Sequence, residues 1–348
     1  MGPRPSTLRL GLCGCILLAL AGTSTAAETC SDENLRKAVP DNAEPIRLSF
    51  NSPRNLGWGD VFYINRARLG DQVAVPGLLI PPPKAKRPFP VVVLISDSYA
   101  YNVSNTRYVS ELAARGIGAF VFDTYCPRGL RDVKGNQAAL SGITTLSDAY
   151  RALRLLAQRA DVDDKKIGLA GWSRGGTMTI LAADQRIRDQ FSDNGLTFRA
   201  GVSVYGSCIQ HLADKTPSPM RLLVQLGTRD GWATVDQCRP VLQKMSKSGF
   251  NVRVHEYDAL HGWDIDQQGE FSLPSEIGFG KCDMIVDAKA NIVEQTTGLE
   301  IRSGDDFVKA TRLCGKVGVS VGGNRHVAEQ SRREFGEFFD LHLNGTGK

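Results

Sequence analysis

Several features of common protein classes are missing from this chain of 348 residues. None of its cysteines has the spacing of a metal site such as C-x-x-C, so no metal ion is expected. Basic and acidic residues are interspersed, and a formal net charge of +5 does not suggest a nucleic-acid partner. Beyond residue 21, no stretch is long and apolar enough to span a membrane. The class of protein left by these exclusions is a globular chain that is long enough to bury a sizeable core.

Residues 1–26 predict a secretory signal. Arg4 and Arg9 form a basic start, and Leu10–Ala21 is an apolar core too short to span a bilayer. The small residues Ser24–Ala27 supply a cleavage site. A lipoprotein signal around the two cysteines of the apolar core is the weaker alternative, because a lipoprotein cysteine should follow that core. We therefore expect a secreted or periplasmic protein.

The most informative stretch is KIGLAGWSRGG, residues 166–176. An apolar run passes into Gly-x-Ser-x-Gly, and a helix-compatible segment follows, which is the order strand, sharp turn, helix. Gly171 and Gly175 would let the backbone turn tightly enough to expose Ser173, the candidate nucleophile. Arg174, at the start of the helix, would offer its backbone N–H to an oxyanion. Alone, the pattern also occurs by chance, so its context decides.

Two later strands end near residues that complete a catalytic triad. The run Met220–Gly227 precedes Asp230, and the run Asn251–Tyr257 precedes His261. A serine nucleophile needs a base to take its proton, and a carboxylate holds the imidazole in the right tautomer. Three other acidic residues compete for the carboxylate role: Asp236, Asp258 and Asp264. We prefer Asp230 because it lies just past a strand in a Gly-x-x-Asp setting.

The strand Phe89–Ile95 is an almost unbroken β-branched run, as expected of a strand buried on both faces. The loop after this strand is where a second oxyanion donor would come from, and we predict the backbone N–H of Ser98. Tyr99 would form a wall of the pocket. The alternative is a plain strand-to-helix connection with Ser98 as a cap, because the glycines often found there are missing.

Three further side chains are candidates for substrate binding. Trp172 and Trp232 flank the nucleophile and the acid, and they either line a pocket or only pack. Arg128 follows the predicted strand 117–123 and would either anchor an anionic substrate group or pair with a neighbouring carboxylate.

Six cysteines lie after the signal, and an even number in an exported chain favours disulfides. Our first choice is Cys208 with Cys238, because both follow strand ends near the predicted acid. The alternative for Cys126 is a free, buried thiol. Cys30 would tie down an otherwise irregular segment over residues 28–45.

The long segment after His261 is expected to form an insertion at about residues 265–322, a flap near the site that a Cys282–Cys314 disulfide would close. By contrast, the glycine-rich residues 55–60 are expected to form a surface loop.

The chain resembles the dienelactone hydrolase family of α/β-hydrolases from about residue 70 to its end. The resemblance rests on four segments: Val162–Gly176 with its GWSRGG core, Gly227-x-x-Asp230, Tyr257-x-x-x-His261-Gly262, and the closing helix Phe335–Leu343. It implies an α/β fold with a mostly parallel central sheet and helices on both faces. It also implies ester hydrolysis. The length that remains after the signal is common for a single α/β enzyme with insertions, so one domain is expected over residues 27–348. Two departures, Ser173 in place of the family's cysteine and the insertion, leave the substrate open.

The chemistry expected of Ser173, His261 and Asp230 is cleavage of a small or medium carboxylic ester through an acyl-enzyme, with no cofactor. A prolyl-oligopeptidase-like peptidase is one alternative, since those enzymes share a Gly-Trp-Ser-x-Gly-Gly turn, but this chain has no room for their N-terminal propeller. A non-catalytic binding protein on the same scaffold is the other alternative, and its expected mark would be a broken triad.

Overall fold

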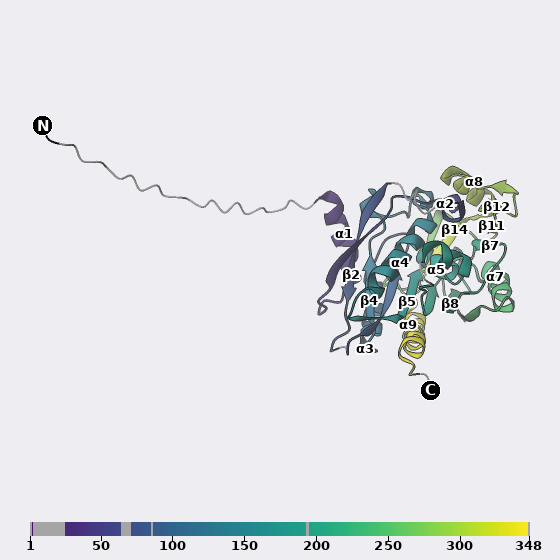
Figure 1. Cartoon of the computed structure of the whole chain (residues 1–348). Coiled ribbons are helices and arrows are strands. Elements are labelled where there is room, and N and C mark those ends of the chain that lie inside the picture. The colour runs from purple at the N-terminus through teal and green to yellow at the C-terminus, as the bar shows by residue number, and fades with distance from the viewer. Residues whose placement is uncertain (1, 3–24, 64–70, 85, 193–194, 347–348) are drawn as a thin grey trace.

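An eight-stranded sheet forms the centre of the molecule (Figure 1). The computed structural model describes residues 2, 25–63, 71–84, 86–192 and 195–346. The strand order is β1-β2-β4-β3-β5-β6-β8-β9, in which β2 runs antiparallel to both of its neighbours, β1 and β4, and all other neighbouring pairs are parallel. The strands are β1 (Ile46–Pro53), β2 (Gln72–Ile80), β3 (Phe89–Ile95), β4 (Gly118–Phe122), β5 (Val162–Trp172), β6 (Ala200–Val204), β8 (Arg221–Gly227) and β9 (Asn251–Tyr257).

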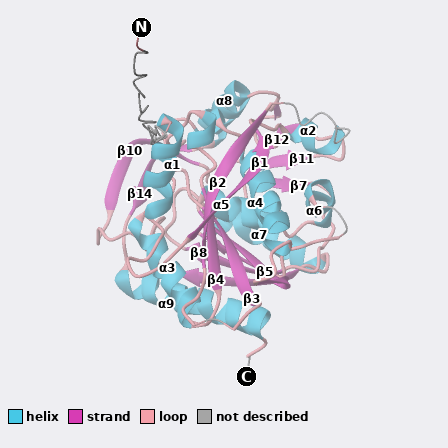
Figure 2. Cartoon of the chain, turned by 60° about the vertical axis from the view of Figure 1, so that its left-hand side comes forward, coloured by secondary structure: helices cyan, strands magenta, loops and turns pink. Residues whose placement is uncertain are grey.

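Helices pack on both faces of this sheet (Figure 2). One face is covered by α1 (Ala26–Arg36), α3 (Val103–Ala114) and α9 (Arg325–Phe339). The other is covered by α4 (Gly142–Ala157), α5 (Arg174–Leu181), α6 (Gln185–Phe191) and α7 (Val235–Lys247). Because both faces are covered, every residue of β3 is buried, as its apolar run predicts. The expected α/β fold is confirmed.

Residues after His261 build most of a second layer at one end of the sheet. In this layer β10 (Phe271–Gly278) pairs antiparallel with β14 (Lys316–Val321). A small sheet contains β11 (Met284–Val286), β12 (Ile292–Glu294), β13 (Leu299–Glu300) and the earlier strand β7 (Gln210–Leu212). The helix α8 (Gly304–Cys314) lies beside this small sheet and the short helix α2 (Trp58–Tyr63) in Figure 1.

Three disulfides link described residues. Cys208–Cys238 and Cys282–Cys314 are as predicted. The alternative of a free Cys126 is wrong, because this residue is bonded to Cys30. The two cysteines are 96 residues apart in sequence, so no local pattern predicts their pairing. They come together because α1 packs on the turn η2 (Cys126–Arg128).

Two predicted irregular segments are more ordered than expected. The first part of residues 28–45 belongs to α1. A capping box between Thr25 and Glu28 begins this helix, and the buried Leu35 packs it against the protein. The loop at residues 55–60 is not simply a surface loop, because Leu56 and Trp58 are buried. The Leu56 backbone N–H donates to Thr144 Oγ1 of α4 at 2.8 Å.

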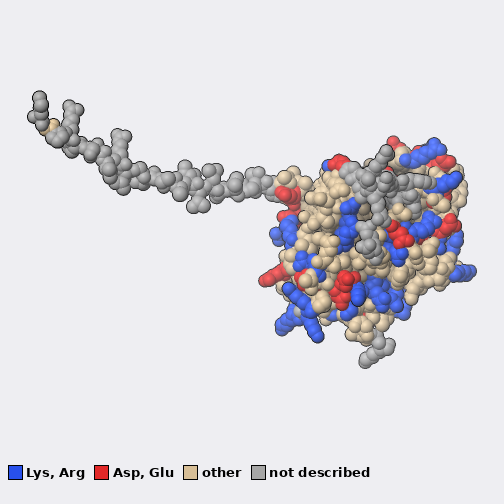
Figure 3. Space-filling view, viewed as in Figure 1, with Lys and Arg blue, Asp and Glu red and all other residues tan. Residues whose placement is uncertain are grey.

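The predicted signal lies almost wholly outside the described residues. Among the helices that are described, none has the length and apolarity needed to cross a bilayer. On the face seen in Figure 3, Lys and Arg side chains are interspersed with Asp and Glu.

Candidate active site

Ser173 lies at a sharp turn between β5 and α5. Its backbone has φ +50° and ψ −114°, a conformation that L-residues rarely adopt and that the surrounding structure must enforce. A Cβ on Gly171 would lie 2.3 Å from the backbone carbon of Gly175, and one on Gly175 would lie 2.5 Å from Ile95 O. Glycine is therefore required at both positions for β5, β3 and α5 to approach this closely.

The side chains of Ser173, His261 and Asp230 form one chain of hydrogen bonds. His261 Nε2 lies 3.0 Å from Ser173 Oγ, and His261 Nδ1 lies 2.7 Å from Asp230 Oδ2. The three residues follow β5, β9 and β8 at the carboxyl edge of the sheet. Chain order and position at strand ends predict this group, and the fold places the three side chains within hydrogen-bonding distance.

Asp230 is held by its own loop. Its Oδ1 accepts hydrogen bonds from the backbone N–H groups of Trp232 and Ala233, both at 2.8 Å, which leaves Oδ2 for His261. Of the competing acids, Asp264 is bonded to the Tyr205 hydroxyl at 2.7 Å. The imidazole of His261 therefore has a fixed orientation toward Ser173.

The surroundings of His261 favour the protonated form of its imidazole. Burial, the largest single effect, disfavours its charged form, but the carboxylates of Asp230, Asp97 and Asp264 together outweigh it, with Asp230 contributing most. The net result is a pKa of His261 above its ordinary value. The rings of Tyr205 and Trp232 lie 4.8 and 5.2 Å from the imidazole, centroid to centroid.

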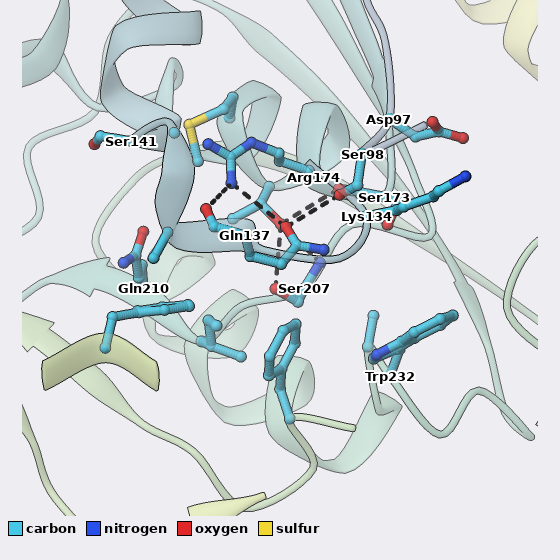
Figure 4. A pocket seen from close by; sticks show the side chains of 18 of the residues that line it. Asp97, Ser98, Lys134, Gln137, Ser141, Ser173, Arg174, Ser207, Gln210 and Trp232 are labelled. Atoms are coloured by element: carbon cyan, nitrogen blue, oxygen red, sulfur yellow. Dashed lines mark hydrogen bonds between the residues drawn. The ribbon is translucent and has the colours of Figure 1, made fainter. Parts of the chain in front are cut away.

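A cavity of about 1040 Å³ opens over Ser173 (Figure 4). The two predicted oxyanion residues, Ser98 and Arg174, line it, as do the predicted wall residues Tyr99 and Trp232. Arg174 is the first residue of α5, so its N–H has no acceptor within the helix. Further walls come from the loop before α2, from the start of α2 and from the segment after His261: Leu56, Trp58, Phe279, Ile292, Ile301 and Phe307.

The prediction that Arg128 binds substrate is wrong. Its guanidinium forms a buried ion pair with Asp148 of α4, with Nη2 2.9 Å from Oδ1 and 2% of the Arg128 side chain exposed. The remaining N–H groups donate to backbone oxygens that include those of Pro53 and Thr124. Arg128 does not line the cavity, because its donors are used to join β1 to α4 and the turn after β4.

The prediction that Trp172 lines the pocket is also wrong. This side chain is 1% exposed and packs against Tyr108 of α3 and Phe335 of α9, with ring centroids 5.0 and 6.2 Å away. Because side chains alternate along a strand, the last residue of β5 points to the α3–α9 face and not toward the cavity.

Sequence reasoning missed two groups beside the imidazole. Asp97 follows β3 and lines the cavity, and its burial raises the pKa of its carboxyl to about 7, although the Tyr99 N–H opposes this shift. Tyr205 follows β6 and has φ +40°. Both residues stand at strand exits on the catalytic edge, and this position was the signal that could have found them. Within the described residues, no group of three His, Cys, Asp or Glu side chains is placed to hold a metal ion.

Comparison with known proteins gives a family match. A model of the dienelactone hydrolase family matches residues 75–291, more than half of the chain. No curated protein matches. Among solved structures, a putative dienelactone hydrolase from Klebsiella pneumoniae subsp. pneumoniae MGH 78578 is 16% identical, with a TM-score of 0.45 over 63% of this chain and 88% of that one. Thermogutta terrifontis esterase 2 phosphonylated by cyclosarin is 17% identical, with a TM-score of 0.47 over 66% of this chain and 88% of that one.

Proposed function

Because the chain belongs to the dienelactone hydrolase family, we propose that it is a serine hydrolase that cleaves a carboxylic ester. The observation that carries this proposal is the chain of hydrogen bonds from Ser173 through His261 to Asp230, at 3.0 and 2.7 Å. A hydroxyl beside an oriented imidazole is the arrangement that makes serine nucleophilic at neutral pH.

The reaction follows from the positions of these side chains. Ser173 Oγ attacks the ester carbonyl while His261 Nε2 takes its proton, and Asp230 stabilises the imidazolium that forms. The backbone N–H groups of Arg174 and Ser98 donate to the carbonyl oxygen as it becomes an oxyanion. His261 then returns the proton to the departing alkoxide, which leaves an acyl group on Ser173. Attack by water, with His261 again as the base, releases the acid.

The cavity supports a small or medium ester with apolar substituents. Its volume of about 1040 Å³ is at the upper end of the range of roughly 300–1000 Å³ that is usual for small-molecule pockets. Aromatic rings of Trp58, Tyr99, Trp232, Phe279 and Phe307 are part of its lining. Both an acyl chain and an alcohol group can therefore be held against apolar walls.

We also propose that the protein acts outside the cytoplasm, as the signal-like residues 1–26 indicate. The three disulfides support this location, because disulfides persist mainly in oxidising compartments. Cell fractionation tests it: intact disulfides and loss of the leader should coincide in the exported fraction, and full-length protein found only in the cytoplasm would contradict export.

The test of activity uses a fluorophosphonate probe together with p-nitrophenyl esters and matched peptide amides. The wild-type chain should be labelled on the peptide that contains Ser173 and should hydrolyse short esters faster than amides. A Ser173→Ala variant that folds normally should do neither. A wild-type protein that is neither labelled nor active on any ester would end the proposal, and faster cleavage of amides would favour the peptidase.

A further inference from the structure

The two proposed oxyanion donors belong to residues whose side chains meet at one atom. Ser98 lies in the loop after β3, and Arg174 is the first residue of α5. The Ser98 hydroxyl donates to Gln137 Oε1 at 3.0 Å, and Arg174 Nη1 lies 3.4 Å from the same oxygen (Figure 4). A third segment, the short turn η3 (Gln137–Ala139), therefore connects the two sides of the predicted oxyanion site.

This segment is fastened to both sides by main-chain groups as well. Arg174 Nη1 donates to the backbone oxygen of Gln137 at 3.1 Å, and Nη2 donates to that of Leu140. On the other side, the Val133 N–H donates to the backbone oxygen of Ser98 at 2.9 Å. Residues 133–140 thus hold the loop after β3 against the start of α5.

Arg174 is an unusual residue for a role in packing alone. Burial lowers the pKa of its guanidinium, and no carboxylate in the described part of the chain forms an ion pair with it. Its Nε is buried and has no hydrogen-bond partner. A buried charge without an ion pair is unfavourable. Every hydrogen bond described for the Arg174 guanidinium goes to residues 137–140. The structural role of this side chain is therefore to hold that segment in place.

We propose that Gln137 is a positioning residue that sets the separation between the N–H groups of Ser98 and Arg174. This inference rests on the proposed function. Oxyanion donors work only when they lie about 2.7–3.1 Å from the oxygen that becomes charged. Ser98 is 4% exposed and its hydroxyl has Gln137 as its partner, so loss of the Gln137 acceptor leaves the loop after β3 without this link.

The insertion extends this arrangement. A Cβ on Gly304, the first residue of α8, would lie 3.0 Å from Ala138 Cβ, so α8 is in direct contact with the turn that carries Gln137. Ser303, Gly304 and Phe307 of the same region line the cavity. The insertion therefore braces the positioning turn as well as forming a wall.

Three variants test the role of Gln137. Gln137→Met removes the acceptor at similar length, Gln137→Glu keeps an acceptor for both Ser98 and Arg174, and Ser98→Ala removes the hydroxyl but keeps the backbone N–H. On a p-nitrophenyl ester, Gln137→Met should lower kcat by about tenfold or more while KM changes by less than about threefold, because the loss concerns the transition state. Gln137→Glu should keep kcat within about threefold of wild type. Gln137→Met with Ser98→Ala should be no worse than Gln137→Met alone, because both remove one link.

A trifluoromethyl ketone provides a readout that a purely structural role would not move. Its adduct with Ser173 carries an oxyanion, so its inhibition constant should rise for Gln137→Met in parallel with the fall in kcat, but not for Gln137→Glu. An active wild type with unchanged kcat in Gln137→Met overturns this inference alone. Equal losses in Gln137→Met and Gln137→Glu, accompanied by equal falls in melting temperature, reduce Gln137 to a packing residue and also overturn it. A wild type without esterase activity or labelling overturns the inference and the proposed function together.

Discussion

Arg128 and Asp148 form an ion pair whose side chains are 2% and 0% exposed, with 2.9 Å between Nη2 and Oδ1. Asp148 also accepts hydrogen bonds from the hydroxyls of Ser52 and Thr124. This cluster joins β1, the exit of β4 and α4, which are distant in sequence. An arginine that looked available for a substrate therefore holds the scaffold together.

Removal of this arginine should be costly for stability. Arg128→Met leaves the carboxylate of Asp148 buried without its cation, so the free energy of unfolding should fall by about 3–5 kcal/mol in urea titrations. The matched control is Arg47→Met, which breaks the exposed pair of Arg47 with Asp32 and should cost less than about 1 kcal/mol. Similar falls in the free energy of unfolding of the two variants would show that the buried pair contributes no more to stability than the exposed pair does.

Asp230→Asn should impair catalysis without unfolding the protein. The amide cannot stabilise the His261 imidazolium and favours the wrong tautomer, so kcat on a p-nitrophenyl ester should fall by about 10³–10⁴-fold. Circular dichroism and the melting temperature check that the fold is kept. The control is Asp258→Asn, which changes an exposed acid beyond β9 and should leave kcat nearly unchanged. A fall of less than tenfold in Asp230→Asn would point to another acid.

The pH profile should show the raised pKa of His261. The neutral imidazole is the base, so kcat/KM should rise with pH through the His261 pKa, at a midpoint above the ordinary value of about 6.5. The carboxylate of Asp97 helps to hold this pKa up, so Asp97→Asn should move the midpoint to lower pH. A midpoint that stays in place, or moves upward, would show that Asp97 does not act on His261.

Asp97 should also make stability depend on pH. Burial raises its pKa from 3.8 to about 7, so the folded state opposes its ionisation. Its contribution to stability is complete below about pH 4 and is lost as the pH rises through about 7. The Asp97→Asn side chain stays neutral and keeps an acceptor for the Tyr99 N–H. At pH 8 the free energy of unfolding of this variant should therefore exceed that of the wild type by about 1–3 kcal/mol. Denaturant titrations from pH 4 to pH 8 measure this gap, and a gap that is constant with pH contradicts the shift.

Gly175→Ala should abolish activity by displacing the turn at Ser173. The added methyl group would lie 2.5 Å from the backbone oxygen of Ile95, so β3 and α5 must separate. Gly135→Ala is the control, because a Cβ there meets nothing within 4 Å. Ester hydrolysis and fluorophosphonate labelling should both be lost in the first variant and kept in the second. Full labelling of Gly175→Ala would show that the turn tolerates a side chain.

Local patterns were sufficient for some features and insufficient for others. Buried apolar runs locate β3 and β8, whereas β9 is a largely exposed edge strand. The residues after β8 and β9 follow from chain order, which is how Asp230 and His261 could be chosen. The partner of Arg128 could not be read in this way, because Asp148 reaches it only through the packing of α4 on β1. Trp172 shows the opposite case, since the alternation of side chains along β5 was a usable signal for its burial.

The pairing of β11 with β7 has a consequence for turnover. The N–H of Met284 donates to the oxygen of Ile209 at 2.7 Å, and the N–H of Ala213 donates to that of Val286 at 2.9 Å, so main-chain bonds tie the insertion to the body of the protein. Swinging the insertion away would break this ladder and expose its N–H and C=O groups to solvent. Substrate should therefore enter, and product leave, through an opening that is already present.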